Sequence, residues 1–319
     1  MLWCPPVERS LVIVNPMASR LRDANVREKL IEAIATALER RDGSEPLVVV
    51  TERETDTRPA VEAGVAEGVG AVIGVGGDGT LRDIATILRG SGIPLGIVPG
   101  GTGNQVAAVL GIPRSLEEAA ASLERARRRT IDLGEVTFDP VDAPPSTSLF
   151  TIGCGLGLDA RIMATTPSEW KQRMGRTSYL VQGMKLALSL EATPHTITID
   201  GQTIETDATI ALVGNMGQLI PGALDLRLPI EPDDGLLDLI VVGARGAIHG
   251  MRGLADQLWR TSLGGDSGSD SVRARGRAIA VEAERPEPVQ IDGDYVGDGS
   301  LSAAILPGAI DVLVPGPKA

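Results

Sequence analysis

Gly76-Gly77-Asp78-Gly79-Thr80 and Pro99-Gly100-Gly101-Thr102-Gly103-Asn104 are the two stretches of sequence that decide the fold. Each glycine-rich turn follows an apolar run typical of a buried strand, at residues 71–75 and 93–98, and each leads into a helical pattern. A strand, a glycine turn and a helix start form an anion site, because backbone N–H groups point outward and the helix dipole favours negative charge. Two such turns indicate a polyphosphate ligand, so a nucleotide is the first hypothesis.

Each turn taken alone is weak evidence for a nucleotide, because glycines at strand ends also serve backbone geometry alone. The turns have neither the Gly-Lys-Ser/Thr of a Walker A loop nor the ribose-binding acid of a Rossmann fingerprint. They contain no lysine, so positive charge would have to come from a metal ion and from backbone amides. Asp78 could meet a nucleotide-bound Mg²⁺, and Thr80 and Thr102 offer hydroxyls to phosphate oxygens.

The length of 319 residues predicts about two domains, and a hydrophobic content of 43% is enough for ordinary cores. Composition also predicts a cytoplasmic protein. Its two cysteines can form neither a disulfide framework nor a zinc site, which fits a reducing compartment. We see no signal-peptide pattern and no run apolar enough to span a membrane. A net charge of -12 argues against general nucleic-acid binding.

The pattern of elements changes once along the chain. Over residues 1–132, short β-branched runs alternate with amphipathic helical patterns, which predicts an α/β domain with a mostly parallel sheet. Over residues 133–306, strand-like runs come with few helical patterns, the exceptions being residues 178–190 and 248–260, which predicts an antiparallel β-rich domain. The tail at residues 307–319 is expected to pack back on the first domain.

Five motifs occur in an order that resembles the diacylglycerol kinase catalytic domain family, which includes bacterial lipid kinases, sphingosine kinases and ceramide kinases. The resemblance covers residues 11–310 and implies an α/β first domain similar to NAD kinase and phosphofructokinase. It also implies a β-sandwich-like second domain, with the nucleotide in the cleft between the two. The motifs are Val14-Asn15-Pro16, the two glycine turns taken together, Gly153 to Ala160, Gly214-Asn215 followed by residues 233–238, and Ile291-Asp292-Gly293-Asp294.

The resemblance also implies a nucleotide site for ATP. Some positions depart from the family pattern: Ala18-Ser19 stand where the family usually has Ser-Gly, and Gln105 stands where it often has Asp. The residues that would line the nucleotide site are Asn15, Thr51, Gly76, Gly77, Asp78, Gly79, Thr80, Gly101 and Thr102.

Three carboxylates, Asp233, Asp234 and Asp238, lie within six residues across a glycine turn. Taken alone, they are typical of the solvated start of an acidic hairpin. The family resemblance implies instead a structural Mg²⁺ bound by the Asp234 and Asp238 side chains and by the Leu236 carbonyl. A site of oxygen ligands alone suits a hard cation.

Asp292 and Asp294 flank Gly293 near the end of a strand, and taken alone they are typical of a turn. In the family, the second of these acids is normally Glu and is the candidate general base that takes the proton from a lipid hydroxyl. Asp294 is one methylene shorter than that Glu. Phosphoryl transfer depends mostly on positioning and charge stabilisation, so one well-placed base with Mg²⁺ suffices.

The segment of residues 161–185 combines five basic side chains with Trp170 and Tyr179. It is interpreted either as a helix with a solvated basic face or as a surface that approaches a membrane, with aromatic rings at the interface. The second interpretation predicts transient, peripheral contact with a membrane.

The sequence therefore predicts an ATP- and Mg²⁺-dependent lipid kinase of phospholipid biosynthesis, which most simply converts diacylglycerol to phosphatidic acid. One alternative is an NAD kinase-like enzyme, which would share the first glycine turn. Another is a non-catalytic homologue that binds a nucleotide or a lipid. The choice of lipid and a homodimeric state are left open.

Overall fold

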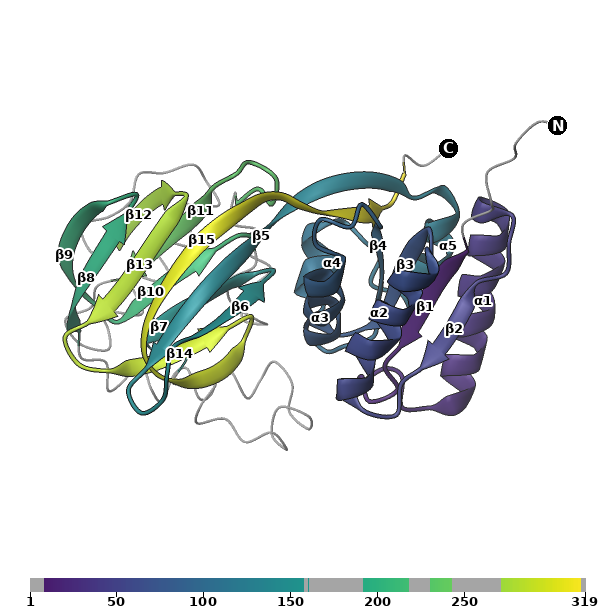
Figure 1. Cartoon of the computed structure of the whole chain (residues 1–319), viewed down its shortest axis with the longest axis horizontal. Helices are drawn as coiled ribbons and strands as arrows, with labels where there is room; N and C mark the ends of the chain where they lie inside the picture. Colours follow the sequence, from purple (N-terminus) through teal and green to yellow (C-terminus); the bar gives the residue numbers. More distant parts are fainter. Residues whose placement is uncertain (1–8, 158–159, 161–191, 218–229, 243–270, 317–319) are drawn as a thin grey trace. The chain divides into compact units, whose positions relative to one another are not determined.

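The computed structural model describes residues 9–157, 160, 192–217, 230–242 and 271–316. It divides into two compact units, Met1–Ile131 with Gly308–Ala319 and Asp132–Pro307. The chain passes from one unit to the other twice, within strands β5 and β15 (Figure 1). The helical patterns at residues 178–190 and 248–260 and the basic segment of residues 161–185 lie outside the described residues.

The first unit is built on a parallel sheet of strand order β15-β4-β3-β1-β2, in which the end of β15 supplies the outer strand beside β4. Its elements are β1 (Ser10–Val14), α1 (Ala24–Asp42), β2 (Leu47–Val50), the 3-10 helix η1 (Glu54–Asp56), α2 (Thr57–Glu67), β3 (Ala71–Gly76), α3 (Asp78–Leu88), β4 (Leu95–Pro99), α4 (Gln105–Val109), α5 (Leu116–Ser122) and the 3-10 helix η2 (Leu123–Arg125).

Burial explains why these residues form a parallel sheet covered by helices. Every residue of β1, β3 and β4 is buried, as expected of strands whose two faces are both covered. Helix α1 packs with α5 and η2, and α2 packs with α3. Local signals set the bounds of α1, because the Asp23 side chain accepts the Asn25 N–H at its start and Gly43, with φ +72°, ends it. The predicted α/β class of this unit is confirmed.

The second unit is β-rich and is built mostly from antiparallel strand pairs. Its strands are β5 (Arg127–Pro140), β6 (Ser146–Phe150), β7 (Gly153–Gly157), β8 (Thr193–Ile199), β9 (Gln202–Ala208), β10 (Ile210–Gly214), β11 (Leu237–Val242), β12 (Ser271–Gly276), β13 (Ala278–Ala283), β14 (Glu287–Ile291) and β15 (Asp294–Val314).

The strands of the second unit follow one another in the order β12-β11-β10-β7-β14-β15, and β15 also pairs with β13 and β5. Strand β13 continues the sheet through β8 to β9, and β5 pairs with β6 (Figure 1). Alternate side chains of these strands form one apolar core. This core includes Phe150 of β6, Leu156 of β7, Val213 of β10 and Val281 of β13. The predicted sandwich-like class of this unit is confirmed.

None of the helices in the described parts of the chain is both long enough and apolar enough to cross a bilayer.

Candidate functional site

The two glycine turns meet at the carboxyl edge of the parallel sheet in the first unit. Strands β3 and β4 pair with Gly76 opposite Pro99, so the turns that follow them are neighbours. The Gly100 N–H donates a hydrogen bond of 2.8 Å to the Gly76 carbonyl. A Cβ added at Gly101 would lie 2.6 Å from the Gly77 Cα, so this close approach of two backbones requires a glycine.

Helix α3 begins directly at the first turn, with Gly77 as its N-cap residue. Glycine has no side chain to bond the first N–H groups, and no side-chain cap is found at this end of the helix in the described structure. The 11 residues of α3 add a dipole whose positive end lies at the turn. The arrangement can hold a phosphate oxygen without a lysine.

Asp78 joins the first turn to the second. Its Oδ1 accepts a hydrogen bond of 3.2 Å from the Val106 N–H in the first turn of α4. A Cβ added at Gly103 would lie 3.0 Å from the Asp78 Oδ2, so the second turn passes close to this carboxylate. Asp78 therefore has a structural task in addition to the metal contact predicted from the sequence.

Asn15 ties the segment after β1 to the first turn. Its Nδ2 donates a hydrogen bond of 3.0 Å to the Thr80 hydroxyl, and its Oδ1 accepts one of 2.9 Å from the Met17 N–H. Thr80 is buried, and a Cβ added at Gly76 would lie 2.8 Å from its Oγ1. The Thr80 hydroxyl thus takes part in the turn's own framework.

The second turn is held in shape by Asn104, which adopts the left-handed conformation with φ +49°. The Asn104 Oδ1 accepts the Gly101 N–H at 2.9 Å, and its Nδ2 donates to the Gly101 carbonyl at 2.7 Å. Thr102 is exposed at the tip, where its hydroxyl donates to the Ser19 Oγ at 3.0 Å. Of the two predicted phosphate-binding hydroxyls, the Thr102 hydroxyl is the accessible one.

Arg20 is a residue at this site that the sequence reasoning missed. Its Nη1 donates to the Pro99 carbonyl at 2.9 Å and to the Arg114 carbonyl at 2.7 Å, and its N–H donates to the Gly100 carbonyl at 3.0 Å. A guanidinium therefore sits against the backbone of the second turn. Because Arg20 comes four residues after Pro16 and outside every motif, only its contacts reveal it.

Thr51 lies at the end of β2, where it is buried. Its N–H and its hydroxyl both donate to the Val14 carbonyl, at 3.0 and 3.3 Å. Thr51 thus fastens β2 to β1, and its predicted contact with a nucleotide stays a prediction. The structure places all of the predicted nucleotide-site residues in the first unit: Asn15, Thr51, Gly76, Gly77, Asp78, Gly79, Thr80, Gly101 and Thr102.

In the second unit, Asp294 is the exposed first residue of β15 and pairs with Ile291 of β14. Asp292 and Gly293 form the tight turn between them, both with positive φ, at 49° and 87°. The Asp292 Oδ2 accepts the N–H and the hydroxyl of Thr151, at 2.9 and 3.1 Å. This anchored turn fixes the backbone that carries Asp294.

The other Asp292 oxygen, Oδ1, accepts the N–H groups of Ile152 and Gly153 at 2.8 and 3.1 Å. Asn215, which is fully buried, extends the same network. Its Nδ2 donates at 3.0 Å to the carbonyls of both Asp132 and Thr151. Sequence reasoning identified Asp292 and Asn215 only as parts of motifs, and their contacts show that they order the segment between β6 and β7.

The acidic block at residues 233–238 contacts arginines. Asp238 is buried and bonds to Arg273 and Arg275, while the Asp234 carboxylate bonds to Arg275. Burial would lower the pKa of Arg275, but the hydrogen bond to Asp234 and the charge of Asp238 outweigh it and raise this pKa. In the described residues, no three His, Cys, Asp or Glu side chains are placed to hold a metal ion. As arranged, the two acids do not fit Mg²⁺.

Leu236, whose carbonyl was predicted to bind the same metal, donates its N–H to the Asp234 Oδ1 at 3.0 Å. This bond shapes the turn that leads into β11.

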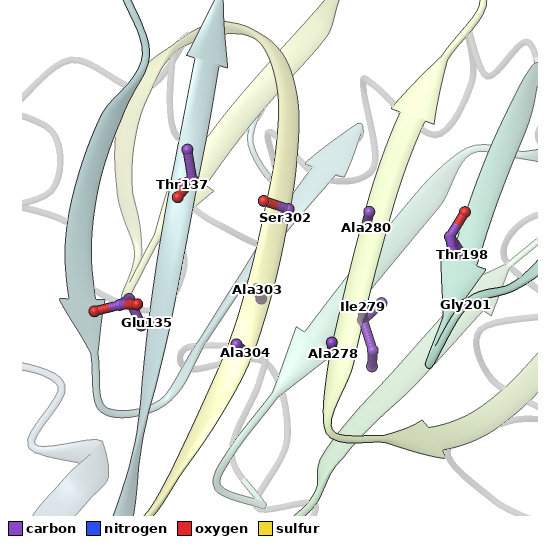
Figure 2. A pocket seen from close by; sticks show the side chains of 10 residues that line it. All are labelled: Glu135, Thr137, Thr198, Gly201, Ala278, Ile279, Ala280, Ser302, Ala303 and Ala304. Atoms are coloured by element: carbon purple, nitrogen blue, oxygen red, sulfur yellow. The ribbon is translucent and has the colours of Figure 1, made fainter.

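A shallow hollow of ≈ 220 Å³ lies on the second unit, over strands β5, β8, β13 and β15 (Figure 2). It contains none of the predicted site residues, and Figure 2 shows mostly short side chains along it. It is therefore separate from the predicted functional residues. Its lining residues are Glu135, Thr137, Thr198, Gly201, Ala278, Ile279, Ala280, Ser302, Ala303 and Ala304.

Comparison with known proteins assigns both halves of the chain. Residues 9–136 match the diacylglycerol kinase catalytic domain, and residues 154–314 match the YegS C-terminal NAD kinase beta sandwich-like domain. The chain belongs to the diacylglycerol kinase catalytic domain family. The family predicted from the motifs is thereby confirmed, and because it is a family of kinases it implies use of a nucleotide such as ATP.

Relatives in the diacylglycerol kinase catalytic domain family come from several bacteria. The chain is 33% identical to a probable YegS-like lipid kinase of Pseudomonas aeruginosa, over 88% of each protein. It is 29% identical to a diacylglycerol kinase of Mycobacterium tuberculosis, over 82% of each. It spans 58% of the length of a Synechocystis protein to which it is 26% identical. A crystal structure of a Bacillus anthracis diacylglycerol kinase has the same fold, with a TM-score of 0.68, 22% identity and 97% coverage of each chain.

Proposed function

We propose that this protein transfers the γ-phosphoryl group of ATP to the hydroxyl of a lipid, with diacylglycerol as the acceptor and phosphatidic acid as the product. The observation that supports this most is the pair of abutting glycine turns at the open start of α3, in a chain of a lipid kinase family. Such a pair offers several N–H groups to one polyphosphate.

On this proposal, the first unit binds the donor nucleotide. The N–H groups at the start of α3 take phosphate oxygens, and the Thr102 hydroxyl at the tip of the second turn adds another donor. Mg²⁺ would accompany ATP and neutralise its β- and γ-phosphates, as in other phosphoryl transfers. Asp78 holds the two turns together through the Val106 N–H, and we propose that its carboxylate would also bond to the hydration shell of that ion.

The second unit supplies the base. As the acceptor oxygen bonds to the γ-phosphorus and the bond to the β-phosphate oxygen breaks, the hydroxyl proton passes to the Asp294 carboxylate. Asp294 is exposed at the start of β15, so a substrate hydroxyl can reach it. The Asp292 turn fixes its backbone.

Because diacylglycerol resides in membranes, the proposal includes brief contact of the protein with a membrane surface. This contact would be peripheral, and the basic segment of residues 161–185 is the part of the sequence that we propose for it.

The test is an acceptor screen with γ-labelled ATP and Mg²⁺. Mixed micelles that contain diacylglycerol, ceramide or sphingosine would be assayed beside NAD, and the products separated on thin layers. Label in phosphatidic acid supports the proposal, and label in a different lipid would retain the kinase but replace its substrate. Labelled NADP would identify the NAD kinase-like alternative. ATP binding with no labelled product would identify a non-catalytic homologue.

A further inference from the structure

Strands β11 and β12 place two arginines on the same face as a buried acid. Asp238 lies directly opposite Arg275 in the antiparallel register, and Arg273 lies opposite Ile240, one diagonal step away on the same face. Directly opposed side chains in such a ladder have Cβ atoms about 4.5–5.5 Å apart, and diagonal neighbours are within reach of long side chains. The strand register therefore brings these charges together.

The contacts use both oxygens of the buried carboxylate. The Arg273 Nη2 lies 2.9 Å from the Asp238 Oδ1, and the Arg275 Nε lies 3.2 Å from the Asp238 Oδ2. Arg275 also bonds through its Nη2 to the Asp234 carboxylate. The Asp238 side chain is 0% exposed, so bulk solvent does not reach it. We refer to Asp234, Asp238, Arg273 and Arg275 together as the Asp/Arg cluster.

We infer that Arg273 and Arg275, rather than a divalent cation, neutralise Asp234 and Asp238, and that the second unit keeps its stability without metal. Two carboxylates and two guanidinium groups make the Asp/Arg cluster neutral without any further ion. An arginine keeps its charge at every accessible pH, so this neutralisation is permanent.

A divalent cation would have to displace the arginines. Mg²⁺ requires about six oxygen ligands at roughly 2.0–2.1 Å, and the carboxylate oxygens it would use are bonded to guanidinium groups. The charge of Mg²⁺ would also repel Arg273 and Arg275, and its binding would take from these arginines the carboxylates to which they are bonded. Strand β11 pairs with β10 on its other edge, and there the residue opposite Asp238 is Gly214. Strand β10 therefore supplies no side chain at that position that could compete with the arginines for Asp238.

Thermal unfolding of the full chain without nucleotide tests the inference directly. The Tm would be measured with EDTA, with Mg²⁺ and with Ca²⁺. A cation bound at a hundredfold its Kd would raise the Tm by on the order of 5–10 °C. We expect the three values to agree within about 1 °C. A fall of several degrees in EDTA that Mg²⁺ reverses would overturn the inference. This readout involves no catalysis, so it is independent of the proposed function.

Variants test the arginines themselves. Replacing both Arg273 and Arg275 by Met leaves Asp238 buried and unpaired, and should lower the Tm by on the order of 10 °C. Arg277→Met is the matched control, because Arg277 is an exposed arginine directly after β12, and its backbone N–H and carbonyl bond to Asp200 and Ile305. Equal Tm values for the double variant and the control would overturn the inference. If the double variant fails to fold, the single variant Arg275→Lys against the same control decides.

Discussion

The Asp78 carboxylate accepts the Val106 N–H at 3.2 Å, a bond that adds to the one from the Gly100 N–H to the Gly76 carbonyl in holding the two glycine turns of the first unit together. It joins the start of α3 to the start of α4, two helices whose N-termini both favour a negative charge. The two turns are therefore held together in the structure without a ligand, and on the proposed function they are ready to bind phosphate. Such preorganisation reduces the ordering that ligand binding requires.

This bond predicts different outcomes for two substitutions of Asp78. Asp78→Asn retains an oxygen that can accept the Val106 N–H, so we expect it to keep ATP affinity within roughly fivefold. Asp78→Ala removes the acceptor and should weaken binding by about tenfold or more. Calorimetric titration with ATP, with and without Mg²⁺, measures both. Equal losses in the two variants would show that the negative charge, rather than the hydrogen bond, is what Asp78 contributes.

Gly101 should not tolerate a side chain. In Gly101→Ala, the new Cβ would lie 2.6 Å from the Gly77 Cα, and because that neighbour is backbone the turns would have to separate. We expect a loss of roughly 1–3 kcal/mol in the free energy of unfolding. Gly77→Ala is the control for packing, since its Cβ would meet the Gly101 Cα at an ordinary 3.5 Å. Chemical denaturation that ranks Gly77→Ala as the more damaging change would contradict this packing.

Asp292 should matter for stability and Asp294 should not. Asp292→Asn replaces one acceptor oxygen by an NH₂ group that faces N–H donors, so two of its four hydrogen bonds are lost. We expect a cost of roughly 2–4 kcal/mol in unfolding free energy. Asp294→Asn, at an exposed position two residues away, should leave the free energy of unfolding nearly unchanged. Thermal unfolding followed by circular dichroism compares the stability of the two variants. Equal unfolding temperatures would contradict the anchoring role of Asp292.

His195 should make stability depend on pH. It is buried on β8, with its Nδ1 2.6 Å from the Thr193 carbonyl and its Nε2 3.6 Å from the Glu287 Oε2. Burial lowers the pKa of His195, but Glu287, the Thr193 carbonyl and Asp207 outweigh it, so the pKa is raised above its ordinary value. A raised pKa in the folded state stabilises the protein fully below the unfolded pKa of about 6.5.

This contribution is lost as the pH rises through the folded-state pKa of His195. We therefore expect the free energy of unfolding to decline above about pH 6.5, and His195→Gln to flatten that decline. Urea denaturation at a series of pH values measures it. A decline of the same size in His195→Gln would assign the pH dependence to other groups.

Much of this fold is readable from the sequence because its signals are local. The buried strands β1, β3 and β4 are runs of β-branched and other apolar residues, and the glycine turns follow β3 and β4 directly. Strand β7 was not predicted from the sequence, because three of the five residues in Gly153–Gly157 are glycines, which have low strand propensity. Its glycines serve packing: a Cβ added at Gly155 would lie 2.6 Å from Leu212 and 2.7 Å from the Ala211 carbonyl.

The site residues that sequence reasoning missed owe their roles to contacts between distant segments. Arg273 and Arg275 precede the final motif in an unremarkable stretch, and only the register of β12 against β11 brings them to Asp238. Asp292 was recognised as part of a motif, but its four donors come from a segment about 140 residues earlier. No local pattern encodes such pairings.

The central claim, transfer of phosphate to a lipid hydroxyl with Asp294 as the base, is tested most directly by one measurement. Labelled γ-phosphate would be followed from ATP into diacylglycerol by the unmodified protein and by Asp294→Asn under the same micelle conditions. We predict labelled phosphatidic acid from the unmodified protein and turnover lower by roughly 10²–10⁴-fold in the variant, with unchanged ATP affinity. Label appearing in phosphatidic acid at equal rates, or in no lipid at all while ATP binds, would contradict the claim.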